Sequence, residues 1–298
     1  DLPKNITDAM NPDSLMTWKD PVPVDLPGFQ PVLDGKPEDI TAAVELMLAA
    51  NRPVIYAGGG IVSSNSQDLL LAFAEKLNCP VTTTIMGLGC FPPGHELALD
   101  VLGMHGSKYA NVAVNEADLV LALGVRFDDR VTGKVDEFIK DGKIIHIDID
   151  RDELNKNKTV TMPICADIRH ALQQLFDRID KAAPGDYQDW INYLSKLKVD
   201  FPFEIPDSAH IKPQFAINLL SEATNGEAIV SLGVGQHQMW AMQHYRARRS
   251  RSFLSSSGFG TMGYGLPAAI GAKSGCPERQ VIDIDGDGSL NMTIHELS

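Results

Sequence analysis

Short apolar runs and longer amphipathic stretches alternate along this chain of 298 residues. The apolar runs end in glycine or charged residues, which is typical of strands buried in a parallel sheet. Between them, apolar residues recur at helical spacing, as in Ile40, Val44 and Met47. We predict strands at 53–57, 80–84, 118–124, 143–148, 228–232 and 280–285, and helices from Pro37, at 66–78, 107–117, 168–179 and 213–224, and from near Asn291. This alternation predicts an α/β fold of doubly wound parallel sheets.

Chain length and the distribution of proline predict the domain organisation. A chain of 298 residues exceeds one ordinary core and predicts roughly two domains. Residues 7–35 are rich in proline and poor in periodicity, which indicates an irregular connector. We therefore predict a central domain at 36–183, a polar linker at 184–210 and a third region at 211–298.

Composition argues against several classes of partner. The net charge is −13 and the isoelectric point is near 5.0, and no basic stripe offsets this acidity, so nucleic acid is not expected as a partner. No stretch approaches the ~20 continuous apolar residues of a membrane span, so no membrane segment is expected. Cys79, Cys90, Cys165 and Cys276 lack CxxC spacing, which predicts reduced core residues in a reducing compartment.

The sequence Gly286-Asp287-Gly288-Ser289 directly follows the last predicted strand. Ligands of parallel α/β sheets bind beyond the carboxyl ends of the strands. A carboxylate between two glycines is well placed there to hold a metal against a phosphate. Mg²⁺ suits such a site because it takes few protein ligands and completes its shell with phosphate oxygens and water. The alternative is a plain turn, since Asp-Gly pairs are strong turn signals.

Glycine and charged residues also follow the strands predicted for the central domain. Gly58-Gly59-Gly60 permits close approach of the backbone to a phosphate. The segment 124–130 offers two arginines and two acids, and the planar guanidinium fork suits a diphosphate. Asp148 ends a further strand and is placed to accept hydrogen bonds from ribose hydroxyls. These features favour a nucleotide site, although GxGxxG is absent and a sharp turn beside solvated charges is the alternative.

The segment Gly260–Ala269, followed by a strand and by Gly286–Ser289, resembles the diphosphate-binding half of thiamine diphosphate enzymes. Residues 235–240, with the sequence GQHQMW, resemble the catalytic subunit of the acetohydroxyacid synthase (acetolactate synthase) family, as do the segments 84–89, 102–106 and 124–131. The resemblance covers nearly the whole chain. It implies that 1–35 holds the end of a pyrimidine-binding domain and a connector, that the central domain binds FAD, and that 211–298 is the N-terminal part of a truncated diphosphate-binding domain.

The resemblance also implies site residues. The implied FAD contacts are Gly58, Gly59, Thr84, Ile85, Leu102, Gly103, Met104, His105, Gly124, Arg126, Asp128, Asp148, Ile149, Asp167 and Ile168. The implied thiamine diphosphate contacts are Gln236, His237, Gly260, Thr261, Met262, Asp287, Gly288 and Ser289, with Asp287 as the Mg²⁺ ligand. The implied catalytic residues are Met262, which wedges the cofactor into its bent form, and Met104 and Arg130, which line the substrate site. There Arg130 would recognise the carboxylate of a 2-keto acid.

The implied activity is that of a transferase of branched-chain amino acid biosynthesis, which decarboxylates pyruvate and condenses the product with pyruvate or 2-ketobutyrate. In the family the flavin has no redox role in this net reaction. The family's essential glutamate and its second Mg²⁺ ligand fall outside this sequence, so we expect a fragment that is inactive alone.

A full-length member would form a homodimer or homotetramer, with a regulatory small subunit as a further partner. It would act in the bacterial cytoplasm or in the stroma or matrix of an organelle. Two alternatives stay open: another thiamine diphosphate carboligase or oxidase, such as glyoxylate carboligase or pyruvate oxidase, and a non-catalytic module that binds a flavin or another nucleotide.

Overall fold

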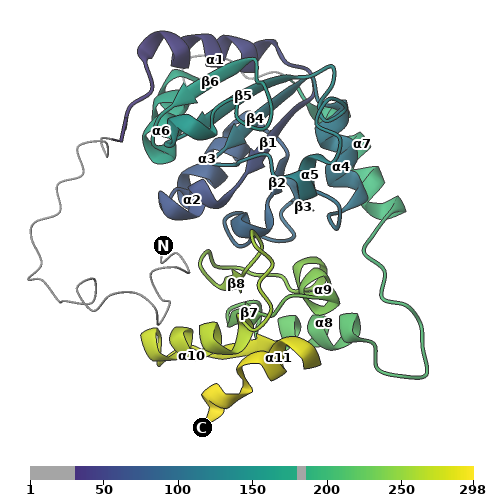
Figure 1. The fold of residues 1–298 in the computed structure, drawn as a ribbon. Coiled ribbons are helices and arrows are strands. Elements are labelled where there is room, and N and C mark those ends of the chain that lie inside the picture. The colour runs from purple at the N-terminus through teal and green to yellow at the C-terminus, as the bar shows by residue number, and fades with distance from the viewer. Residues whose placement is uncertain (1–30, 180–185) are drawn as a thin grey trace, which may run out of the picture. The chain divides into compact units, whose positions relative to one another are not determined.

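A computed structural model describes residues 31–179 and 186–298 (Figure 1). The compact unit formed by the chain from Pro31 to Ser298 contains two parallel sheets. Most of the predicted N-terminal connector, 1–35, lies outside the described residues. The elements predicted from the sequence are present, and, apart from the start of the last helix, each predicted end lies within one residue of the observed one.

The central sheet has six parallel strands in the order β3-β2-β1-β4-β5-β6. Its strands are β1 (Pro53–Ala57), β2 (Val81–Thr83), β3 (Ala98–Val101), β4 (Leu119–Leu123), β5 (Lys143–Asp148) and β6 (Met162–Cys165). The strand order reverses direction between β1 and β4, and ligands of doubly wound sheets bind in the crevice at such a switch point. The topology therefore marks the carboxyl ends of β1 and β4 as a binding position.

Helices cover both faces of the central sheet (Figure 1). They are α1 (Pro37–Ala49), α2 (Gly59–Ser63), α3 (Gln67–Leu77), α4 (Lys108–Glu116), α5 (Asp129–Thr132), α6 (Ile168–Ile179) and α7 (Gln188–Asp200), with short 3₁₀ turns η2 (Ile85–Gly87) and η3 (Arg151–Glu153). Alternate residues of β1 point to opposite faces: Ile55 packs with α1, α3 and α6, whereas Tyr56 packs with α4 and α7. Burial on both faces explains why these strands read as continuous apolar runs.

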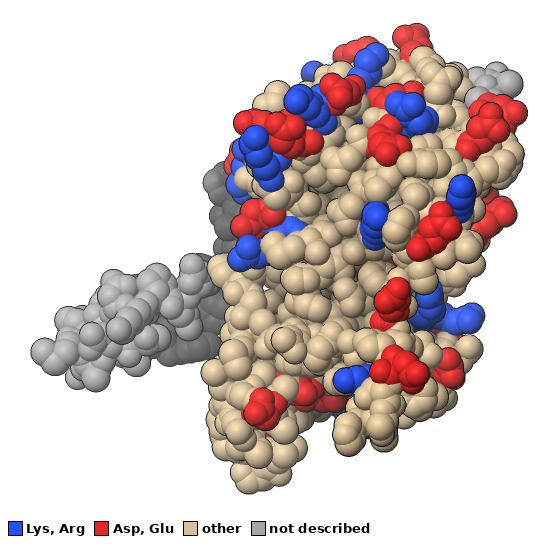
Figure 2. Space-filling model, turned by 90° about the vertical axis from the view of Figure 1, so that its right-hand side faces the viewer, with Lys and Arg blue, Asp and Glu red and all other residues tan. Residues whose placement is uncertain are grey.

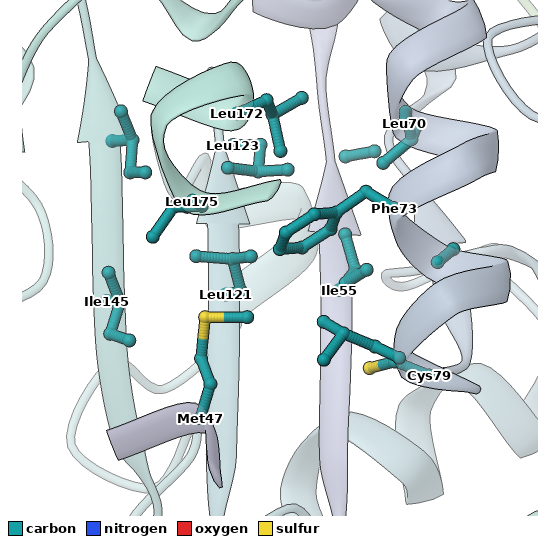
Figure 3. Packing of buried hydrophobic residues seen from close by; sticks show 14 of the residues in the cluster. Met47, Ile55, Leu70, Phe73, Cys79, Leu121, Leu123, Ile145, Leu172 and Leu175 are labelled. Carbon is teal, nitrogen blue, oxygen red and sulfur yellow. The ribbon is translucent and has the colours of Figure 1, made fainter. Parts of the chain in front are cut away.

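One of the two cores is drawn in Figure 3. Phe73 of α3 and Leu172 and Leu175 of α6 pack over Ile55 of β1 and Leu121 of β4, and all five are buried. Burying side chains of this size contributes about 1.5–3 kcal/mol each. This core fixes the strands whose carboxyl ends carry the site.

Residues 188–200 of the predicted linker form the helix α7, which packs on the central sheet. Trp190 is 5% exposed and donates a hydrogen bond from Nε1 to the carbonyl oxygen of Pro53 at 3.1 Å. Tyr187, just before the helix, donates to the carbonyl oxygen of Met47 at 3.1 Å. Tyr187 and Trp190 thus act as core residues, whereas Tyr193 and Phe201 are each 40% exposed.

The second sheet has three parallel strands in the order β8-β7-β9. Its elements are α8 (Pro213–Ala223), β7 (Ile229–Leu232), α9 (Gln236–His244), β8 (Phe253–Ser255), α10 (Gly265–Gly275), β9 (Val281–Ile284), α11 (Asp287–Thr293) and the 3₁₀ turn η4 (Ile294–Leu297). Val101 of the central sheet joins the core of this region, together with Val230 and Leu232 of β7. The two sheets therefore share a packed boundary.

Two expectations for the last strand and helix were wrong. The strand at 280–285 was expected to be buried, but β9 is half-buried along its length because, within the described residues, it pairs only with β7 at the edge of the sheet. A helix was expected to begin near Asn291, but α11 begins at Asp287. Gly286 is extended at the N-cap, and an acid in the first turn stabilises the positive end of a helix.

Charged side chains of both signs are interspersed on the face drawn in Figure 2. The cysteines are all free; Cys79 and Cys90 are buried in the core, whereas Cys165 and Cys276 are partly exposed, in contrast to the expected core position. Within the described residues, no helix is both long and apolar enough to cross a membrane.

Candidate functional site

Two glycine loops cross at the carboxyl ends of β1 and β4. The amide of Gly58 donates to the carbonyl oxygen of Leu123 at 2.9 Å, and the amide of Gly60 donates to that of Gly124 at 3.1 Å. A Cβ atom on Gly60 would lie 2.5 Å from Cα of Gly124, and one on Gly58 would overlap the Gly124 carbonyl oxygen. Only glycine allows this crossing, which lies at the switch point of the sheet.

An open cavity of about 790 Å³ lies at this switch point. Its volume is within the range of small-molecule sites. The predicted FAD contacts that line it are Gly59, Thr84, Ile85, Leu102, Met104, His105, Gly124, Arg126, Asp128 and Asp148. These residues lie far apart in the sequence, from Gly59 to Asp148. The parallel strands that precede them bring them to one cavity.

The other predicted FAD contacts lie outside the lining. Gly58 forms the glycine crossing, and Gly103 borders a neighbouring hollow that also contains Met104 and Arg130. Asp167 accepts hydrogen bonds from the amides of Arg169 and His170 and so caps α6. Ile168 is buried in the core, and Ile149 is 44% exposed.

The charged groups at the cavity are partly paired with one another. A guanidinium nitrogen of Arg126 lies 3.2 Å from Oδ2 of Asp128, and both side chains keep solvent-exposed surface. Asp128 also accepts from the amide of Arg130 at 3.0 Å, which starts α5. Burial raises the pKa of Asp148 above its usual range. The cavity thus combines an exposed guanidinium with a partly desolvated carboxyl at the end of β5, a pairing that fits a nucleotide's phosphate and ribose.

The two predicted substrate-site residues lie beside each other. The amide of Met104 donates to the carbonyl oxygen of Arg130 at 2.9 Å, and the Met104 side chain is 62% exposed. The guanidinium of Arg130 is also exposed, with its nearest carboxylate, that of Asp129, at 3.7 Å. An exposed ion pair of this length contributes little, so the guanidinium stays available to another carboxylate.

The second sheet brings three loops together beyond its carboxyl ends. The segment 233–235 follows β7, the segment 256–263 follows β8, and the segment 286–289 follows β9. The amide of Gly263 donates to Oγ of Ser289 at 2.9 Å, and Ser289 is buried. The predicted thiamine diphosphate contacts lie on these loops and in the first turns of α9 and α11.

Three of those predicted contacts have specific positions in the second sheet. Met262 is 40% exposed, and a Cβ atom on Gly288 would lie 3.2 Å from its Cε atom. Asp287 is exposed, and Oδ1 accepts from the amide of Gly288 at 2.8 Å. Within the described residues no cluster of three or more His, Cys, Asp and Glu forms a metal site. A single exposed carboxylate fits Mg²⁺, which is commonly held by one or two protein carboxylates and by phosphate oxygens.

A small acidic cluster lies beneath these loops. Nε2 of His237 is 3.5 Å from Oδ1 of Asp285, whose side chain is 5% exposed. Burial, followed by the nearby charge of Asp285, raises the pKa of Asp283 to about 6. One oxygen of each aspartate is buried and has no hydrogen-bond partner among the described residues.

The loop 256–263 links the two candidate sites, which the sequence analysis did not anticipate. Ser256, Ser257, Gly258 and Phe259 line the central cavity, and Phe259 is fully exposed. Oγ of Ser257 lies 2.8 Å from Sδ of Met86, across the boundary between the sheets. The signal in the sequence was the run SSSGFG directly before Thr261 and Met262.

Comparison with known proteins matches both parts of this arrangement. Residues 40–175 match the family model described as "Thiamine pyrophosphate enzyme, central domain". Residues 233–298 match the model described as "Thiamine pyrophosphate enzyme, C-terminal TPP binding domain". Both models describe domains of thiamine pyrophosphate enzymes, and the chain resembles that family over both ranges.

Within that family its similarity is to acetolactate synthases. It is 48% identical over 307 residues to "Probable acetolactate synthase 2, chloroplastic" of Oryza sativa subsp. japonica, covering 100% of this chain and 45% of the relative. It is 48% identical over 305 residues to "Acetolactate synthase 2, chloroplastic" of Nicotiana tabacum, with coverage of 100% and 45%. It is 45% identical over 302 residues to "Acetolactate synthase large subunit" of Corynebacterium glutamicum, with coverage of 100% and 47%. The chain spans about half the length of these relatives.

Proposed function

We propose that the protein to which this chain belongs is an acetolactate synthase, which decarboxylates pyruvate and condenses the product with pyruvate or 2-ketobutyrate. The observation that carries this proposal is the convergence of three strand-end loops beyond β7, β8 and β9 in a chain that matches acetolactate synthases over its full length. Thiamine diphosphate supplies the electron sink for the decarboxylation when it is bound.

The residues beyond the second sheet support binding of thiamine diphosphate with Mg²⁺. Glycines 235 and 286 leave space for the ring of His237 at the ends of β7 and β9, because a Cβ atom on either would lie about 3 Å from that ring. Gln236 and His237 in the first turn of α9 would hold the diphosphate, and Asp287 would hold Mg²⁺. Thr261 and Met262 would contact the cofactor from the third loop. The chain's own part is to bind and orient, since positioned cofactors carry the difficult chemistry.

We further propose that the central cavity binds FAD. Its place at the switch point of a sheet with the order β3-β2-β1-β4-β5-β6 supports a dinucleotide. The glycine crossing and Arg126 suit the phosphates, and the partly desolvated carboxyl of Asp148 suits the ribose hydroxyls. Met104 and Arg130 at the rim support recognition of a 2-keto acid carboxylate by the exposed guanidinium.

The partners and location of the protein are also proposals. We propose a homodimer or homotetramer, with a regulatory small subunit as a further partner. The location is the bacterial cytoplasm or the stroma or matrix of an organelle. The names of the relatives from rice and tobacco include the word chloroplastic.

The test uses the complete gene product with pyruvate, Mg²⁺, thiamine diphosphate and FAD. Acetolactate should form, and Asp287→Ala should abolish retention of thiamine diphosphate in a fluorescence titration. A matched control is Asp136→Ala, which alters an exposed acid of the central region. Formation of acetyl phosphate with oxygen consumption would favour an oxidase of the same family. Unchanged cofactor affinity in Asp287→Ala would contradict the metal site.

A further inference from the structure

The ring of His237 is wedged between the starts of two helices. A Cβ atom on Gly235, before α9, would lie 2.9 Å from Cε1 and 3.1 Å from Nδ1 of the ring. A Cβ atom on Gly286, before α11, would lie 3.0 Å from each of the same two ring atoms. The edge of the imidazole formed by Nδ1 and Cε1 therefore faces both glycine loops, which are the loops proposed to receive the diphosphate.

The opposite edge of the ring faces a buried carboxylate. Nε2 of His237 is buried and has no hydrogen-bond partner among the described residues. Oδ1 of Asp285 lies 3.5 Å away, an ion-pair separation, and the two side chains are 13% and 5% exposed. A carboxylate this deeply buried needs a compensating donor or charge, and His237 is the side chain that the structure places opposite it.

The Asp285 carboxylate is itself held in place. Oδ1 accepts from the amide of Gly286 at 2.9 Å. A Cβ atom on Gly233 would overlap Oδ1, and one on Gly265 would lie 2.9 Å from Oδ2. The glycines at the ends of β7 and at the start of α10 therefore leave the space that the carboxylate fills. The orientation of the Asp285 carboxylate is therefore fixed by backbone groups around it.

We propose that Asp285 is a positioning residue: it holds Nε2 of His237 and thereby turns the Nδ1 edge of the imidazole toward the loops that bind the cofactor diphosphate. The proposal deepens the proposed function and rests on it. Rotation of a histidine ring about χ2 costs little energy. A hydrogen-bond or ion-pair partner on one ring nitrogen therefore determines the direction in which the other nitrogen points.

The experiment measures the affinity of the complete gene product for thiamine diphosphate and Mg²⁺ by fluorescence titration. Asp285→Asn removes the charge at nearly constant volume, and His237→Gln removes the ring. We expect each single variant to weaken binding on the order of tenfold, as for loss of a charge-assisted hydrogen bond. We expect the double variant to bind about as weakly as His237→Gln alone, because Asp285 acts through His237. The matched control is Asp283→Asn on the same strand, which should bind within about twofold of the parent.

The outcomes separate this proposal from the proposed function. Unchanged affinity in Asp285→Asn overturns the positioning role, whereas unchanged affinity in Asp287→Ala overturns the cofactor site itself. Multiplied losses in the double variant would assign Asp285 a role independent of His237. If Asp285→Asn lowers the thermal midpoint and loses flavin to the same extent as it loses thiamine diphosphate, Asp285 stabilises the fold and does not position His237. The expected result is loss of cofactor affinity with an unchanged midpoint and flavin content.

Discussion

The backbone amide of Met104 donates a hydrogen bond to the carbonyl oxygen of Arg130 at 2.9 Å. Met104 follows β3 and Arg130 belongs to α5, which follows β4, so this bond ties together two loops from different strands. Both side chains are exposed at the rim of the central cavity. The pair gives the proposed substrate site a hydrogen-bonded backbone and two exposed side chains.

Arg130→Lys should raise the KM for pyruvate about tenfold in the complete gene product, because a forked carboxylate contact becomes a point charge. The thermal midpoint should stay within about 1 °C of the parent, since an exposed side chain contributes little to stability. Arg178→Lys on α6 is the matched control and should leave KM unchanged. A saturation curve for Arg130→Lys that matches the parent would exclude Arg130 from carboxylate recognition.

Gly124→Ala should destabilise the protein more than Gly133→Ala does. Both glycines have positive φ, of 59° and 56°, so alanine at either position strains the backbone. Gly133 has open space around it, whereas a Cβ atom on Gly124 would overlap Cα of Gly60. Overpacking should cost Gly124→Ala roughly 1–3 kcal/mol more. Chemical denaturation measures both variants, and equal losses would show that the crossing tolerates a side chain.

Asp283 should make stability depend on pH. Its pKa is raised to about 6 by burial and by the charge of Asp285, so the folded state favours the protonated form. This contribution is fully present below the usual aspartate pKa of about 4 and is lost as pH rises through about 6. Solvent reaching the carboxyl reduces the size of the effect but not its sign.

The variant Asp283→Asn isolates this pH dependence because it removes the titrating group at nearly constant volume. Its thermal midpoint should exceed that of the parent by more at pH 8 than at pH 5. Parallel scans of the two proteins at both values provide the measurement. A difference in midpoint that is the same at pH 5 and pH 8 would contradict the raised pKa.

Trp190→Ala should destabilise the central sheet by about 3–5 kcal/mol, because it removes a large buried side chain. It also removes the hydrogen bond to the carbonyl oxygen of Pro53. Val199→Ala is the matched control on the same helix, since Val199 is 79% exposed and should change stability by no more than about 0.5 kcal/mol. If both variants unfold at the parent's denaturant midpoint, α7 contributes nothing to the central core.

The sequence alone was sufficient to predict the elements that are marked by a pattern of neighbouring residues. Leu119–Leu123 reads as a buried parallel strand because its residues are apolar on both faces. The glycine loops at 58–60 and 286–288 mark strand ends because only glycine tolerates their close contacts. The segment 260–269 indicated a diphosphate-binding region through its resemblance to thiamine diphosphate enzymes, and it lies within the range that matches the C-terminal TPP binding domain.

Signals that were weak or non-local escaped sequence reasoning. The strands β3, β6 and β8 have three or four residues each, too few for a hydrophobic period to stand out. α7 reads as polar because only one narrow face of it is buried.

The contacts between distant residues were decided by the tertiary structure alone. Asp285 opposes His237 only because β9 pairs with β7 in parallel register, which brings the loops after the two strands together. Ser256–Phe259 line the central cavity only because the two sheets pack at a shared core. Local propensity and spacing act over a few residues, whereas strand pairing and packing set which loops meet, so the chain's motifs identify the chemistry and the sheets assemble the site.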